Sequence, residues 1–157
     1  MATAASPCCG ARRGHVVTQP KTEYSKPLPL MEGLAKGFYD WCQQRELRFQ
    51  RCSDCSAWRH VPREMCAQCG SWRWEWSKSS GRGRVFTWTL VARAMHPAFQ
   101  DDVPYASVVV EMNEGVRLVT QVVDCPPDEL EIDMPVEVVF DDVTPEVTLP
   151  KFRRVRE

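Results

Sequence analysis

The sequence predicts a mainly β protein with an N-terminal amphipathic helix, a rubredoxin-like four-cysteine zinc ribbon and a C-terminal five-stranded OB-fold barrel. Three observations support this prediction: helical spacing of apolar residues over 32–50, two Cys-x-x-Cys pairs, and a second half rich in β-branched runs separated by turn residues. We expect a flexible arm over residues 1–31, a helix-plus-ribbon unit over 32–80 and the barrel over 81–157.

The composition is that of a soluble globular protein, with 43% hydrophobic and 26% charged residues. No run approaches the roughly 18 apolar residues that a membrane-spanning helix needs. Residues 1–20 lack the apolar centre of a secretory signal. We therefore expect a cytoplasmic protein, whose eight cysteines are metal ligands and free thiols rather than disulfides.

The first 31 residues are rich in Ala, Ser, Pro and Thr and show no periodicity, which indicates a flexible arm. Residues 24–30 are expected to be extended, because two prolines disfavour helix in the residues before them. This part is either a linker or an arm that lies along a partner.

Residues 32–50 are predicted to form one helix. Gly33 and Gly37 weaken it by up to ~1 kcal/mol each relative to Ala, but they also let another group approach closely. The stripe either packs on the protein's own ribbon or forms an interface or ligand surface. Its members are Leu34, Phe38, Trp41, Cys42, Arg45 and Phe49.

The two cysteine pairs, Cys52/Cys55 and Cys66/Cys69, predict one metal centre. A thiolate pair at i and i+3 can bind one metal from a tight turn, and two such turns complete a tetrahedron. Zinc is favoured, with iron in a rubredoxin-like site and disulfides as alternatives. Because four thiolates leave no exchangeable position, we expect a structural metal and not a catalytic one.

The ribbon around these cysteines is too small to bury much apolar surface. We therefore expect the metal to supply much of its folding free energy, since structural zinc typically contributes ~10–16 kcal/mol. Trp72, Trp74 and Trp76 alternate with polar residues, which predicts a strand with three indoles on one face. His60, between the pairs, is interpreted as a surface residue rather than a spare ligand.

Residues 79–84, Ser-Ser-Gly-Arg-Gly-Arg, predict a hinge between the two units. They lack the Lys-Ser/Thr of a P-loop and the spacing of a dinucleotide fingerprint. Arg82 and Arg84 nevertheless remain candidate phosphate contacts.

The second half predicts five strands with a long connection between the third and the fourth. This arrangement favours an OB-type Greek-key barrel, with an SH3-like barrel as the alternative. The strands are expected at Val85–Ala92, Tyr105–Met112, Val116–Val123, Val136–Phe140 and around 147–149.

No catalytic set is recognisable: the three histidines are dispersed and no G-x-S-x-G motif is present. The carboxylate pairs at 101–102 and 141–142 are interpreted as solvated loop charges. His96, with Phe99 and Tyr105, is the candidate functional loop, and a loop packed over the barrel mouth is the alternative.

The charge is divided unequally along the chain. Residues 32–84 carry ten Lys/Arg against six Asp/Glu, whereas residues 85–157 carry six against fourteen. Nucleic-acid binding is the natural alternative function, because ribbons and OB barrels both perform it. An acidic barrel argues against it, since a single-strand-binding groove must be basic.

The order of helix, four-cysteine ribbon and barrel is similar to that of the zinc-ribbon/OB-fold acyl-CoA-associated family. The resemblance covers residues 24–155, and one departure is Ser56, where the knuckle often has Gly. The motifs that carry it are Cys66-x-x-Cys69-Gly70-Ser71, Trp74-Glu75-Trp76, Ser80-Gly81-Arg82-Gly83, His96-Pro97-Ala98-Phe99, Pro104-Tyr105 and Glu114-Gly115-Val116-Arg117-Leu118.

This resemblance implies a non-catalytic subunit that binds or supports a thiolase-like enzyme, such as an aldolase of steroid side-chain breakdown, and helps to bind CoA thioesters. The alternative partner is a hotdog-fold enoyl-CoA hydratase, and an autonomous thioester hydrolase is a third reading. A basic front half would attract the CoA phosphates. The residues implied to contact the partner or acyl-CoA are Phe38, Trp41, Arg45, Arg82, Arg84, His96, Phe99 and Tyr105.

Overall fold

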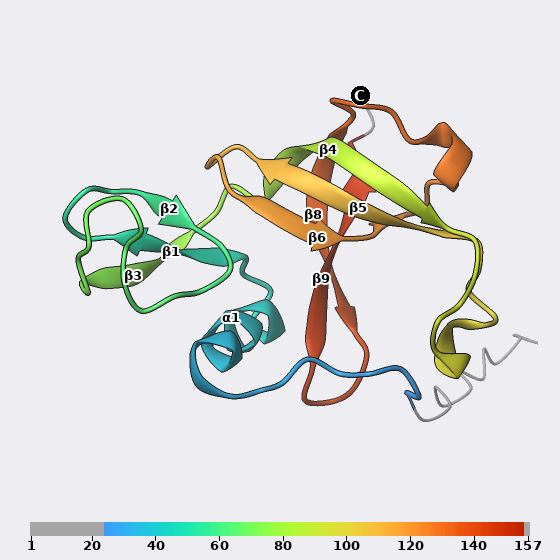
Figure 1. The fold of residues 1–157 in the computed structure, drawn as a ribbon, viewed down its shortest axis with the longest axis horizontal. Coiled ribbons are helices and arrows are strands. Elements are labelled where there is room, and N and C mark those ends of the chain that lie inside the picture. Colours follow the sequence, from blue (N-terminus) through green and yellow to red (C-terminus); the bar gives the residue numbers. More distant parts are fainter. Residues whose placement is uncertain (1–23, 156–157) are drawn as a thin grey trace, which may run out of the picture.

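The computed structural model describes residues 24–155 and confirms the predicted fold class (Figure 1). One helix precedes a three-stranded ribbon sheet, and a six-stranded sheet curls into the barrel. Residues 24–31 form neither helix nor strand and bend at Lys26, and the predicted extended course of residues 24–30 stays a prediction. The rest of the predicted flexible arm, residues 1–23, lies outside the described residues.

The helix α1 spans Gly33–Gln43 and is shorter than predicted. Arg45 has a left-handed φ of 61°, which ends the helix, and strand β1 (Arg48–Cys52) follows. Phe49 therefore belongs to a strand and not to the helical stripe. The reason is long-range pairing: every residue of β1 has a partner in a distant strand, and this ladder overrides the local helical spacing.

The ribbon sheet has the order β2-β1-β3, with β2 at Trp58–Arg59 and β3 at Trp74–Lys78. The prediction that three indoles share one strand face is wrong for Trp72, which precedes β3 and is 67% exposed. Trp74 and Trp76 do meet, edge to face, with ring centroids 5.6 Å apart. Gly37 of α1 lies against Trp76, so the helix approaches the ribbon closely there.

The barrel strands follow the sheet order β6-β5-β4-β8-β9-β7. The predicted third strand is divided into β6 and β7. The parallel pairing of β7 with β9 closes the barrel. This connectivity is that of the predicted OB barrel. The bounds are β4 Arg82–Val91, β5 Tyr105–Met112, β6 Arg117–Thr120, β7 Val122–Val123, β8 Pro135–Asp142 and β9 Thr148–Arg154.

One hydrophobic core continues from the barrel into the helix and ribbon. Phe38 and Cys42 of α1 and Phe49 of β1 are buried in it. Arg45 also attaches α1 to the barrel, since its guanidinium donates to the carbonyl of Phe140 at 3.0 Å and pairs with Asp142. The barrel contribution comes from Val85, Val108, Val110, Leu118, Val136 and Phe152.

The predicted hinge at 79–84 is wrong in its second half. Arg82 to Arg84 begin β4 and pair with both β5 and β8. Ser79 is buried, and its N–H donates to the carbonyl of Leu47 at 2.9 Å. The connection is therefore hydrogen-bonded to the ribbon unit at Ser79 and to the barrel at residues 82–84. Two 3-10 helices, η1 (Pro97–Phe99) and η2 (Pro127–Glu129), complete the barrel loops.

Within residues 24–155, no helix combines the length and the apolar character that crossing a bilayer requires.

Candidate metal centre and groove

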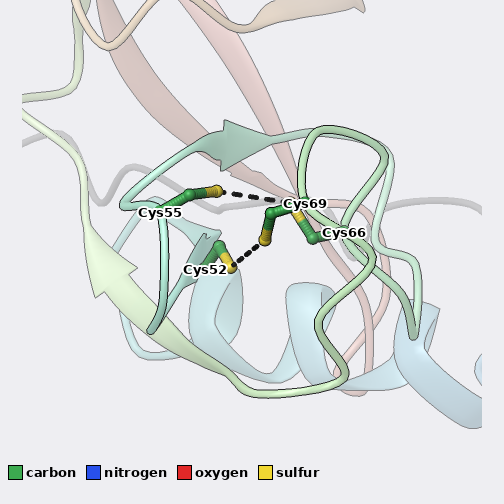
Figure 2. Close-up of side chains that lie close together, drawn as sticks. All are labelled: Cys52, Cys55, Cys66 and Cys69. Carbon is green, nitrogen blue, oxygen red and sulfur yellow. Dashed lines mark hydrogen bonds between the residues drawn. The ribbon is translucent and has the colours of Figure 1, made fainter.

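The four cysteines converge at one end of the ribbon (Figure 2). Their sulfurs all lie within 4.8 Å of one another. The Cys52–Cys69 and Cys55–Cys66 sulfur pairs are each 3.6 Å apart. A tetrahedron with Zn–S bonds near 2.3 Å has sulfurs about 3.8 Å apart, so the spacing suits such an ion.

Each pair sits on a tight turn that exposes backbone N–H groups to the first sulfur. The N–H groups of Cys55 and Asp54 lower the pKa of Cys52 to about 6. Those of Cys69 and Gln68 lower the pKa of Cys66 in the same way. Gly70 leaves the second turn with a φ of 72°, a conformation that glycine adopts without strain. Each turn therefore favours a thiolate, the form that binds metal, at its first cysteine, whereas the sulfurs beside them raise the pKa values of the second cysteines, Cys55 and Cys69.

A salt bridge joins the two turns independently of any ion. The carboxylate of Asp54, in the first turn, accepts hydrogen bonds from the hydroxyl of Ser71 and the guanidinium of Arg73, after the second turn. The N–H of Ser53 also donates to the carbonyl of Arg73 at 3.0 Å. The donor set and its supports fit a tetrahedral metal held by Cys52, Cys55, Cys66 and Cys69, which would cross-link the ribbon.

His60 does not join this cluster, and its interpretation as a surface residue is wrong. Its ring lies 5.0 Å from that of Phe38 and 5.3 Å from that of Phe49, between centroids. Its Nδ1 is buried with no hydrogen-bond partner among the described residues. Burial lowers the pKa of His60 to about 4, so the imidazole is neutral at pH 7.

The same imidazole borders a large groove of about 1050 Å³ between the helix, the ribbon and the barrel. The apolar wall includes Phe38, Val61, Leu118 and Leu149. This volume is at the upper end of the range for small-molecule sites. The arm enters this groove at Tyr24, so four separate parts of the chain build it.

The charges around the groove are compensated. Lys26 pairs with Asp102 at 2.5 Å and also lies 5.4 Å from the centre of the Phe99 ring. Lys151 pairs with Asp141 at 2.9 Å. Asp102, which stays exposed as predicted, and Asp141 are therefore held in ion pairs, and Asp141 belongs to strand β8 (Pro135–Asp142) rather than to a loop. The groove wall is consequently close to neutral, with Thr120 and Gln121 as polar members beside the apolar ones.

The aromatic residues predicted as contacts are divided between two places. Phe38 and Phe99 line the groove. Tyr105 stacks on Phe99 at 5.9 Å, and His96 lies edge-on to it at 6.2 Å, so the predicted loop cluster forms. The Nδ1 of His96 accepts from the N–H of Ala98, an N-cap for η1. Trp41 does not line the groove.

The predicted cationic contacts do not form one site. Trp41 is covered by the guanidinium of Arg48, 4.0 Å from its ring. Arg45 holds the helix to the barrel, and Arg84 is engaged with Glu111. Arg82 is exposed, and its side chain makes no ion pair with any residue that the structure describes. Contact of these residues with a partner or acyl-CoA stays a prediction.

Sequence reasoning missed the groove and with it His60. The imidazole meets Phe38 and Phe49 only because α1 folds across the ribbon. The only available signal was the position of His60 beside the apolar Val61 and Pro62, which also line the groove.

These features define a class: a cysteine-based metal ribbon fused to an OB barrel through a helix. Two family models match adjoining parts of the chain, "ChsH2, rubredoxin-like zinc ribbon domain" over residues 42–75 and "ChsH2, C-terminal OB-fold domain" over residues 76–141. The chain belongs to this ChsH2/DUF35 family. The predicted family resemblance is thereby confirmed.

Three related proteins set this membership in context. A "Probable enoyl-CoA hydratase alpha subunit" of Thermomonospora curvata is 38% identical over 136 residues, covering 87% of this chain but 42% of that protein. A "DUF35 domain-containing scaffold protein" of Methanothermobacter thermautotrophicus is 34% identical, covering 53% of this chain and 77% of that protein. The solved "Ltp2-ChsH2(DUF35) aldolase" contains a chain with 38% identity and a TM-score of 0.74, covering 81% of this chain and 98% of that one.

Proposed function

We propose that this protein is a non-catalytic, acyl-CoA-associated subunit that binds and supports a thiolase-like enzyme, an aldolase or a thiolase of lipid breakdown. The observation that carries the proposal is the match over 98% of the ChsH2(DUF35) chain of an aldolase assembly. The scaffold name of the archaeal relative supports the same role. That the lipid is a steroid side chain is also part of the proposal.

In this proposal the metal is a structural Zn²⁺ on Cys52, Cys55, Cys66 and Cys69. Four thiolates leave no open position for a substrate, so the ion would stabilise the ribbon only. The helix and ribbon, residues 32–80, and the barrel, residues 81–157, then act as two halves of one docking unit joined by the shared core.

An enoyl-CoA hydratase is the alternative partner, and the name of the Thermomonospora curvata relative favours it. That relative is more than twice as long as the matched region, so the hydratase activity of the whole protein does not transfer to this chain.

Co-expression tests the proposal and separates the partners. The chain is expressed with the thiolase-like protein encoded beside its gene and, in parallel, with a neighbouring hydratase-like protein. We expect one co-purifying complex with the thiolase-like protein and a higher turnover of that enzyme in the complex. Separate elution with unchanged turnover would refute the thiolase assignment, and co-purification with the hydratase alone would transfer the role to it.

A further inference from the structure

The barrel has an open seam beside the groove. Strand β6 stands at one end of the sheet order and, within residues 24–155, has β5 as its single ladder partner. Residues 118–121, from β6 and the residue that follows it, and residues 149–151, from β9, both line the groove, yet these two stretches form no ladder. Only beyond this point does β7 pair with β9 and close the barrel.

The register shows which main-chain groups of β6 face the seam. The N–H of Met112 donates to the carbonyl of Val116 at 2.9 Å. Hydrogen-bonded pairs alternate in an antiparallel ladder, so Leu118 bonds to β5 and Val119 does not. The N–H and C=O of Val119 therefore point away from β5. Two residues later the carbonyl of Gln121 accepts from Phe152 of β9, which places this edge toward β9.

Pro150 explains why the seam stays open. If the parallel β7–β9 ladder continued upstream, the N–H of residue 150 would donate to the carbonyl of Val119. Proline has no N–H. Its carbonyl accepts instead from the hydroxyl of Thr120 at 2.9 Å. One donor and one acceptor of Val119 are thus left without a ladder partner in the described part of the chain.

We propose that this seam receives an extended, uncharged segment of the partner enzyme, which adds as a strand to β6 at Val119. The inference rests on the proposed function, since it takes the thiolase-like enzyme as partner. An exposed strand edge recognises extended backbone, and the flanking pockets recognise alternate side chains. The occupant is uncharged because the cations of the groove are already paired with carboxylates.

Val119→Pro tests the pairing directly, with Val119→Thr as its control. Proline removes the N–H that faces the seam, and the ladder to β5 does not use that N–H, so an edge strand tolerates it. Threonine keeps the N–H and the branched shape at a side chain that is 70% exposed. We expect Val119→Pro to raise the Kd for the thiolase-like enzyme at least 10-fold relative to Val119→Thr, at equal zinc content.

Pro150→Val tests the same seam from the other side and does not depend on the first variant folding. Valine supplies the missing donor to Val119, so the free subunit should melt at a higher temperature while its affinity for the enzyme falls. A variant that binds as tightly as the wild type with an unchanged melting temperature would overturn the inference.

Hydrogen exchange at the Val119 amide identifies the occupant. We expect fast exchange in the free subunit and at least 100-fold slower exchange in the complex. Equal exchange in both states, or slowing by octanoyl-CoA alone, would overturn the peptide assignment, and the second result would assign the groove to a thioester. If the wild type forms no complex, the proposed function itself fails. If Val119→Pro binds as Val119→Thr does, only the strand addition fails.

Discussion

Gly83 in β4 lies so close to Glu111 in β5 that a Cβ at position 83 would come within 2.5 Å of the Glu111 carbonyl oxygen. The same Cβ would approach the Cγ1 of Val110 at 2.9 Å. Backbone in a paired strand cannot move aside easily. Glycine is therefore needed at position 83 for β4 to pair this closely with β5, although the surrounding sequence resembles a hinge.

Gly83→Ala should destabilise the protein by about 3 kcal/mol, the upper part of the usual range for overpacking. Urea unfolding of the zinc-loaded protein measures this. Gly37→Ala is the matched control, because its Cβ would be 3.0 Å from the Trp76 ring, a side chain that can shift. The gain in helix propensity, up to ~1 kcal/mol, should offset that crowding. Equal midpoints for Gly83→Ala and wild type would contradict the prediction.

His60 should make the protein sensitive to mild acid. Burial lowers its pKa from 6.5 to about 4, so the unfolded chain binds this proton more readily than the folded one. The stabilising effect of the neutral imidazole is complete above pH 6.5 and is lost progressively as the pH falls toward 4. Between pH 7.5 and 5.5 the loss should be roughly 1 kcal/mol.

His60→Leu should remove this part of the acid sensitivity. The measurement is the free energy of unfolding of wild type and variant over that pH range, and the difference between them cancels the titration of the metal ligands. Parallel pH profiles for the two proteins would show that His60 is charged or solvated in the folded state.

Arg45→Ala should weaken the attachment of α1 to the barrel, and it also tests the predicted contact of Arg45 with the partner. The substitution removes one hydrogen bond to the Phe140 carbonyl and one ion pair with Asp142. The side chains of Arg45 and Asp142 are both about half exposed. Exposed pairs contribute up to about 1 kcal/mol. Lys36→Ala, which breaks the Lys36–Asp40 pair within the helix, is the control. A tenfold loss of partner affinity at unchanged stability would confirm Arg45 as a contact residue, and an unchanged affinity would refute that contact.

Cys66→Ser should lose bound zinc, cooperative unfolding and complex assembly together. Serine is a poor replacement for a thiolate ligand, and structural zinc contributes ~10–16 kcal/mol to such ribbons. Metal analysis, thermal melts and co-purification with the partner measure the three losses. Cys125→Ser, at a half-buried thiol outside the cluster, should leave them unchanged. A Cys66→Ser protein that stays folded and partner-bound but loses turnover would mean that the metal has a catalytic role.

Local patterns predicted well wherever the determining contacts are local. Cys52 and Cys55 share one turn, so their convergence on a second such turn could be read from spacing. The strand Tyr105–Met112 was predicted with its observed bounds, because its β-branched run also has the strand period. The helix was predicted too long, since Phe49 fits the helical stripe as well as it fits β1.

The sequence by itself determined the order of the units, the convergence of the four cysteines and the family, because these depend on residue types at short, regular spacings. Only the tertiary structure decided the groove, the burial of His60 and the open seam between Val119 and Pro150. Each of these depends on which distant strands pair and in which register. A one-residue shift of register would turn the Val119 main chain toward β5 and would give the free edge to Leu118 and Thr120 instead.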